Sequence, residues 1–154
     1  MKRYASSVGA LALLLIAVPS LAGNGFSGKV RTIKDGDSIT VSSKGRWVDV
    51  NLAGVKAPTR GQTLGPEAKE FLTQLASKQR VQVEVVETAL DGTTVANVTL
   101  EDGRDLATLM IEGGYAWTTT RATEAQRSAA KRAEASALGV YADSGSDTTA
   151  ETGS

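Results

Sequence analysis

The 154-residue chain contains no cysteine and no histidine. These two absences exclude disulfides, thiolate nucleophiles, imidazole general bases and zinc sites with histidine ligands. Any catalysis must therefore use carboxylates, lysine, arginine, hydroxyl groups or a metal ion bound through oxygen atoms. The missing cysteines say little about the cellular compartment, because a domain of this length can bury enough apolar surface without cross-links. The length allows one ordinary domain.

An excess of either charge is also missing, since 17 basic residues balance 17 acidic ones. Setting aside Lys2 and Arg3, which belong to the N-terminal segment described next, leaves 15 basic residues against 17 acidic ones. Nucleic-acid binding draws much of its affinity from Lys and Arg side chains that neutralise phosphates. Because the chain shows no cluster of cations, we expect weak non-specific binding to nucleic acid.

The N-terminus has the three parts of a secretory signal peptide. Met1–Arg3 is basic, Val8–Val18 is an apolar run, and small residues follow at Ser20 and Ala22. This arrangement predicts cleavage after Ala22, so that residues 1–22 are removed and the mature protein is secreted or periplasmic. The alternative is an uncleaved membrane anchor, but the apolar run is short for a bilayer. After cleavage we expect no membrane span.

The remaining chain divides into a folded part and a tail. Residues 143–154 are small, polar and weakly acidic without apolar periodicity, which predicts a disordered tail. Residues 23–142 carry the patterns of one domain. Alternating apolar residues and turn signals predict five strands, at residues 26–33, 37–41, 46–52, 80–87 and 94–100.

Three helices are predicted, beginning near Pro66, Asp105 and Thr123. The first has apolar residues at helical spacing. The second is expected to stop at Gly113, and the third, which opens with a capping box, at Gly139. Three strands, a helix, two strands and two helices make an α+β layout. This order predicts a five-stranded Greek-key barrel of the OB type with three helices.

Several short motifs have a specific order and spacing. They are DGDS at 35–38, LAGVKAP at 52–58, GQ at 61–62, GPEA at 65–68, DG at 91–92, IEGGYAW at 111–117 and LGVY at 138–141. Over roughly residues 28–142 the chain resembles the staphylococcal-nuclease (thermonuclease-like) family, whose corresponding segments include DGDT, RLxGIDAPE, GQ and GxEA. The resemblance implies the same barrel fold.

The resemblance also implies where chemistry would occur. In active members the second Asp of DGDT and the Asp of IDAPE hold a calcium ion, and the Glu of IDAPE is the proposed general base. Two arginines, one in RLxGIDAPE and one in a YGR hairpin motif, hold the phosphate. These roles suit the chemistry, because calcium prefers several oxygen ligands and phosphorus in the transition state needs fixed cations.

Matching these positions residue by residue gives one retention and four losses. Asp37 keeps the first calcium-ligand position, whereas Lys56 stands at the second. Thr59 replaces the general base, and Asn51 and Thr93 replace the two arginines. An ammonium group in place of a carboxylate repels a divalent cation instead of attracting it. At metal-ligand distance this repulsion costs several kcal/mol, even at an effective dielectric constant of about 20. We therefore interpret the chain as a degenerate member of the family.

Each of these residues also has a simpler interpretation. Asp37 is expected to pair with Lys56 or to accept hydrogen bonds from nearby backbone amides. Lys56 is either a solvated loop lysine or an internal cation in place of a metal. Arg60, and also Arg46 or Arg31, could substitute for the lost phosphate-binding arginines, although isolated surface arginines usually only aid solubility.

Trp47 is out of phase with the core residues of its predicted strand. It is either an exposed stacking platform or a side chain packed under the last helix. Two functional classes stay open. We expect a catalytically deficient monomer that has no cofactor. It is expected to bind an unknown ligand, with Arg60, Lys56 and Trp47 as the candidate contacts. The alternative is a weak or altered calcium-dependent phosphodiesterase acting on DNA or RNA, and on balance the residues argue against an enzyme.

Overall fold

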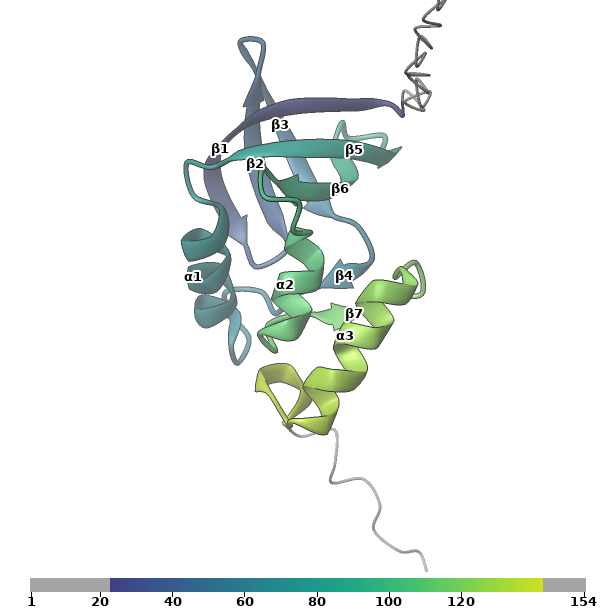
Figure 1. Cartoon of the computed structure of the whole chain (residues 1–154). Helices are drawn as coiled ribbons and strands as arrows, with labels where there is room; N and C mark the ends of the chain where they lie inside the picture. Colours follow the sequence, from purple (N-terminus) through teal and green to yellow (C-terminus); the bar gives the residue numbers. More distant parts are fainter. Residues whose placement is uncertain (1–22, 143–154) are drawn as a thin grey trace, which may run out of the picture.

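The computed structural model of the protein describes residues 23–142. Five strands form a closed barrel in the order β1-β2-β3-β6-β5 (Figure 1). Their bounds are Gly25–Asp35 for β1, Ser38–Ser43 for β2, Arg46–Leu52 for β3, Arg80–Thr88 for β5 and Thr94–Leu100 for β6. Neighbouring strands pair antiparallel except β3 and β6, which pair parallel and close the barrel.

The period-two pattern of β3 places its residues on two faces, as expected. Val50 and Leu52 are buried in the barrel core, and Val48 is half-buried. Asn51 and Trp47 are exposed on the outer face. The alternation therefore separates a core face from a face that is free to contact a ligand.

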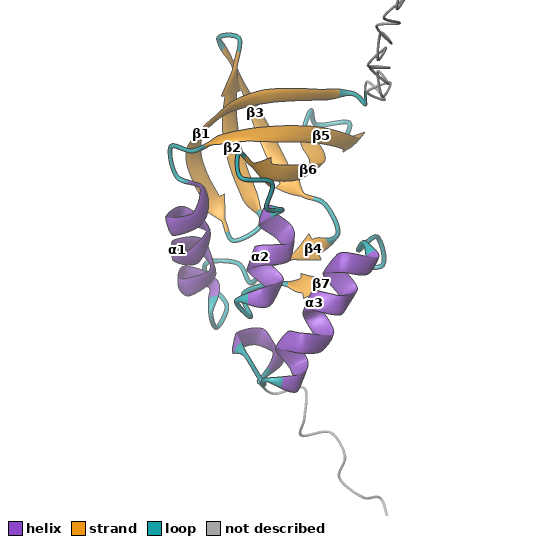
Figure 2. Ribbon diagram, in the orientation of Figure 1, coloured by secondary structure: helices purple, strands orange, loops and turns teal. Residues whose placement is uncertain are grey.

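Three α-helices pack at one end of the barrel (Figure 2). They are α1 (Gly65–Ala76), α2 (Leu106–Glu112) and α3 (Glu124–Ala135), followed by a 3₁₀ turn at Gly139–Tyr141. A two-stranded sheet of β4 (Val55–Lys56) and β7 (Trp117–Thr118) lies beside them. The predicted α+β class, the five-stranded barrel and the three helices are confirmed.

The capping box of α3 is present and also has a long-range role. Thr123 and Gln126 exchange the two expected hydrogen bonds. The Gln126 side chain in addition donates to the carbonyl of Ala53, at 3.1 Å, and is 2 % exposed. Gly54, with φ of +79°, leaves the space that the Gln126 side-chain oxygen occupies. The cap of α3 therefore holds the loop that follows β3.

The largest differences from the sequence predictions are the end of the third helix and the segment after β3. The third helix ends at Ala135, not at Gly139, because Ala137 takes a positive φ of 47° and the N–H of Leu138 bonds back to the carbonyl of Ala133. Between β3 and α1, where no strand was predicted, the chain forms β4. Its pairing with β7 is a contact distant in sequence, which local patterns do not reveal.

The signal peptide predicted at 1–22 and the polar tail predicted at 143–154 lie outside the described residues, so both stay predictions. Within residues 23–142, no helix has the length and apolar character that crossing a membrane requires.

Candidate functional site

Asp37 lies in the turn between β1 and β2, and the local packing fixes its position. A Cβ atom on Gly36 would approach the Cβ atoms of Ala57 and Ala68 to 2.8 Å each. Glycine is therefore required for the turn to sit against α1 and the loop after β4. This close approach directs Asp37 toward that loop, where it is only 7 % exposed.

The Asp37 carboxylate is engaged by two donors from the loop. The backbone N–H of Ala57 donates to its Oδ2 at 3.0 Å, and the Nζ atom of Lys56 lies 3.1 Å from the same oxygen. The side chain of Lys56 is 63 % exposed, whereas that of Asp37 is 10 % exposed. Both simpler interpretations of Asp37 thus hold together: it pairs with Lys56 and accepts a backbone hydrogen bond.

Two of the other substituted positions are close to this pair in the strand ladder or along the chain. Asn51 faces Ser38 across the β2–β3 ladder, at the same end of the barrel as Asp37. Thr59 donates its N–H and its hydroxyl to the Gln62 side chain, at 2.8 and 3.2 Å. Asn51 and Thr59 are exposed and uncharged. They give this end of the barrel neither a base nor a phosphate-binding cation.

Thr93 directly precedes β6, in the turn that follows β5. Its N–H donates to the Asp91 carboxylate at 2.9 Å, which closes the turn between β5 and β6. This hydrogen bond is the main reason that the pKa of Asp91 is below its ordinary value. The Asp91 carboxylate therefore accepts a hydrogen bond within its own turn.

The residues around Asp37 do not fit a calcium ion. Calcium takes about six to eight oxygen ligands, usually including several carboxylates. Among residues 23–142, no group of three or more Asp, Glu, His or Cys side chains is arranged to hold a metal ion. The one carboxylate retained here already contacts an ammonium group. The Asp37 carboxylate therefore faces a positive charge, a pairing that does not suit a divalent cation.

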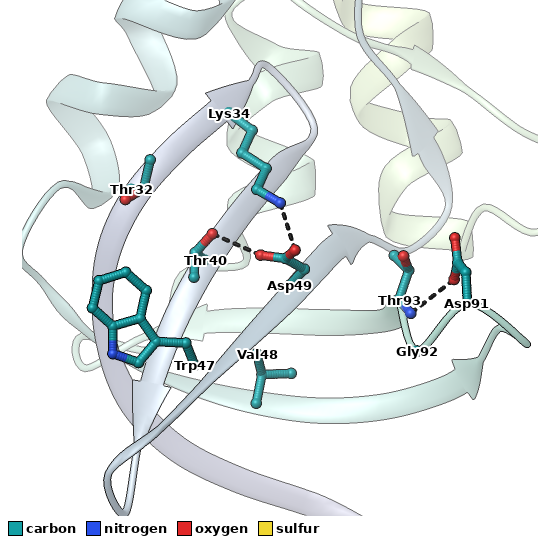
Figure 3. Close-up of a pocket in the computed structure, with 9 residues that line it drawn as sticks. All are labelled: Thr32, Lys34, Thr40, Trp47, Val48, Asp49, Asp91, Gly92 and Thr93. Atoms are coloured by element: carbon teal, nitrogen blue, oxygen red, sulfur yellow. Dashed lines mark hydrogen bonds and ion pairs between the residues drawn. The ribbon is translucent and has the colours of Figure 1, made fainter.

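A separate groove of about 620 Å³ lies on the outer face of the barrel (Figure 3). The Lys34 Nζ atom lies 2.5 Å from the Asp49 carboxylate, which also accepts a hydrogen bond from the Thr40 hydroxyl at 2.8 Å. The Lys34 hydrogen bond, followed by that of Thr40, lowers the pKa of Asp49 from its ordinary value. Thr93 lines the same groove.

Trp47 lines the end of this groove away from Lys34 in Figure 3. It is 72 % exposed, so the structure selects the exposed arrangement over packing under the last helix. Four residues along β3 separate it from Asn51, about 13 Å at the usual strand rise. The fold therefore does not bring Trp47 into the surroundings of Asp37.

The arginines considered as substitutes lie in different places. Arg60 is exposed next to Thr59, and it makes no ion pair within residues 23–142. Arg31 instead lines a second outer groove together with Lys29, Lys44 and Arg80. The expectation that this near-neutral chain has no cluster of cations is therefore wrong. The fold gathers in space cations that are dispersed in sequence.

Sequence reasoning missed Asp49, Lys34 and this second cluster as candidate contacts. The alternation along β3 already placed residue 49 on the outer face beside Trp47. No comparable signal was available for the cluster, because it depends on β1 pairing with both β2 and β5.

The comparisons with known proteins identify the family. The family model described as "Staphylococcal nuclease homologue" matches residues 49–140. A "Micrococcal nuclease" of Shigella flexneri is 32 % identical over 149 residues, covering 89 % of this chain and 84 % of that protein. "Protein ParB" of Escherichia coli is 31 % identical, covering 76 % of this chain and 72 % of that protein.

An "Uncharacterized endonuclease" of Escherichia coli O157:H7 is 26 % identical, covering 70 % of this chain and 69 % of that protein. The family match begins at residue 49 and so includes Lys56 and Thr59 but not Asp37. Barrel topology, motif order and these similarities together lead to one conclusion: the chain belongs to the staphylococcal nuclease family.

Proposed function

We propose that this protein is a secreted, catalytically deficient member of the nuclease family that acts as a binding module. The observation that supports the proposal is the Lys56 ammonium group, 3.1 Å from the one carboxylate retained at the calcium position. This ammonium neutralises Asp37 and repels a divalent cation from the same oxygen. The protein is then independent of calcium.

The other substitutions act in the same direction. Thr59 has no carboxylate to take a proton from water, and Asn51 and Thr93 have no charge for a phosphate group. Removing one such base or electrostatic group typically lowers a rate by about a hundredfold or more. Losses within one catalytic unit are not additive, but together they bring the reaction close to background.

The names of the relatives favour a second candidate. Two of the similar proteins are called a nuclease and an endonuclease. In this alternative the chain is a weak or altered phosphodiesterase for DNA or RNA, with Asp37 acting beside Lys56 or Arg60. The two candidates differ in whether calcium is needed and in whether phosphodiester bonds are cleaved.

A cleavage assay separates the two candidates. The purified protein is incubated with DNA and with RNA, in calcium or in EDTA, beside an active nuclease of the family and an Asp37→Asn variant. We expect no calcium-dependent cleavage, and no rise in melting temperature with calcium, since a ligand that binds the native state must stabilise it. Cleavage that needs both calcium and Asp37, within about a few hundredfold of the active relative, would favour the phosphodiesterase.

A further inference from the structure

The second outer groove, which we call the basic groove, collects cations from three separate segments. It has a volume of about 500 Å³ and is formed by β1, the β2–β3 turn and the start of β5. Its cations are Lys29, Arg31, Lys44 and Arg80, and its lining, all within residues 23–142, contains no Asp or Glu. Four positive charges therefore share one concave surface.

Strand register explains how the groove forms and what lies next to it. Lys29 faces Ser42 on β2 and Arg80 on β5, and Ser42 faces Trp47 on β3. Partners across a ladder point to the same side of the sheet, so these four residues form one row over four strands. The row is about 14 Å wide at the usual strand spacing. An exposed indole thus lies at one end of the row and an arginine at the other.

Three of the four cations of this groove have no ion-pair partner among the described residues. Within the described part of the chain, Lys29, Arg31 and Lys44 have no carboxylate at ion-pair distance, and Arg80 has only a 3.9 Å contact to Glu101. Other cations are closely paired, for example Lys34 with Asp49 at 2.5 Å. The positive potential of the basic groove is therefore available to a ligand.

We propose that the basic groove and Trp47 together form a binding surface for a single-stranded nucleic acid, separate from the Asp37 site. Lysine and arginine side chains neutralise the phosphates, and the exposed indole stacks on an unpaired base. A duplex keeps its base faces covered and leaves Trp47 without a partner. A membrane is flat and contacts a protruding surface more readily than a recessed one, so the concave lining favours a strand.

This inference adds a ligand class to the proposed binding module but does not depend on the catalytic state of Asp37. Trp47 lies about 13 Å along β3 from Asn51, so the groove and the Asp37 turn are separate surfaces. Measuring binding in EDTA excludes calcium-dependent cleavage. Failure to bind would overturn this inference, whereas cleavage in calcium would overturn the proposed loss of catalysis.

The test measures fluorescence anisotropy of a labelled oligothymidylate of about 12 nucleotides, a length within known single-strand site sizes. The protein is titrated in EDTA at salt concentrations from about 50 to about 200 mM. The charge variant is Lys29→Gln with Lys44→Gln. Its matched control is Lys69→Gln with Lys131→Gln, which removes the same charge from α1 and α3, outside the groove. Trp47→Ala is the third variant.

We expect the charge variant to bind about tenfold more weakly at low salt, with a salt slope smaller by about 1.4 for the two lost phosphate contacts. The control should change affinity by less than about twofold, and Trp47→Ala should weaken binding about fivefold or more. Each substituted side chain in the groove and Trp47 itself is exposed, so folding should be unaffected; circular dichroism verifies this.

Three results would overturn the inference. The first is no binding of the oligonucleotide at low salt. The second is an equal loss in the charge variant and its control, which would indicate diffuse attraction only. The third is unchanged binding in Trp47→Ala together with equal or tighter binding to a duplex or to vesicles of phosphatidylglycerol and phosphatidylcholine. That pattern would indicate that the groove binds polyanions in general or a membrane surface.

Discussion

The two ends of the outer β1–β2–β3 face use positive charge in opposite ways. At the Asp37 end, Lys56 lies 3.1 Å from a mostly buried carboxylate, and the pair has no net charge. At the hairpin end, the basic groove holds four cations and its lining has no carboxylate. A cation that has an internal partner stabilises the fold, whereas one without a partner is available for a ligand.

This difference also separates the two proposals made above. At the Asp37 end, the Gly36 turn and the loop after β4 hold a carboxylate against the ammonium group of Lys56, so the neutralising charge comes from the chain itself. The hairpin end lies about 13 Å away along β3 and is not constrained by that chemistry. Under the two proposals made above, ligand recognition at one end is independent of catalysis at the other.

The largest expected effect comes from restoring the lost charges at the Asp37 end. Under the proposed loss of catalysis, Lys56→Asp, Thr59→Glu, Asn51→Arg and Thr93→Arg supply the second calcium ligand, the base and the two phosphate-binding cations that the family resemblance implies. We expect calcium-dependent DNA cleavage to rise by about a thousandfold or more over the unmodified protein. The measurement is an initial rate in calcium and in EDTA.

The control for this variant carries the same substitutions plus Asp37→Asn, which removes the remaining ligand. It should lose the gained activity. If the restored protein folds, as circular dichroism shows, and stays inactive, the pocket has changed in shape as well as in charge. The contrast between the two ends would then be one of geometry.

A smaller expected effect, on stability, distinguishes the paired cation Lys56 from the unpaired cation Lys29. Lys56→Met leaves the Asp37 carboxylate with only the Ala57 N–H, so we expect the free energy of unfolding to fall by about 1 kcal/mol, reduced by the exposure of the lysine. Lys29→Gln in the basic groove should change it by less than about 0.5 kcal/mol. Urea denaturation of both variants measures this, and equal losses would remove the distinction.

The smallest effect concerns Asp49, which lies between the two ends. Its hydrogen bonds from Lys34 and Thr40 lower its pKa in the folded protein below the ordinary value of 3.8. The stabilisation is therefore present above this value and is lost as pH falls through the lower folded-state pKa. Lys34→Met should raise the Asp49 pKa toward 3.8 and remove a small part of the stability at neutral pH.

A carboxyl NMR titration measures this shift. Asp102 is the internal control, because the Arg104 hydrogen bonds that lower its pKa lie elsewhere and should be unaffected. An unchanged Asp49 pKa in Lys34→Met would show that the Lys34 contact is not formed in solution.

Much of the fold could be predicted because its signals are local. The β3 strand was predicted at its observed bounds, since its alternation is visible within seven residues. The capping box at Thr123 likewise needs only three neighbouring positions. The end of α3 was misplaced, because Ala137 takes a left-handed conformation that its residue type does not favour.

For the candidate site, the motifs predicted which positions would be neighbours but not what each side chain contacts. That Asp37 pairs with Lys56 was an expectation from charge alone, and the geometry adds the Ala57 N–H as a second donor. The exposure of Trp47 stayed open in the sequence, because an aromatic residue out of phase on a strand suits either solvent or another layer.

The sequence by itself determined the element order, the family and which residue types stand at the family's motif positions, because these depend on residue type and on spacing within short segments. Only the tertiary structure decided where the charges accumulate. Lys29, Lys44 and Arg80 lie far apart in the chain, and they meet because β1 pairs with β2 on one side and β5 on the other. The electrostatic potential depends on the distances between charges in space. Closure of the barrel sets these distances, whereas separation along the sequence does not.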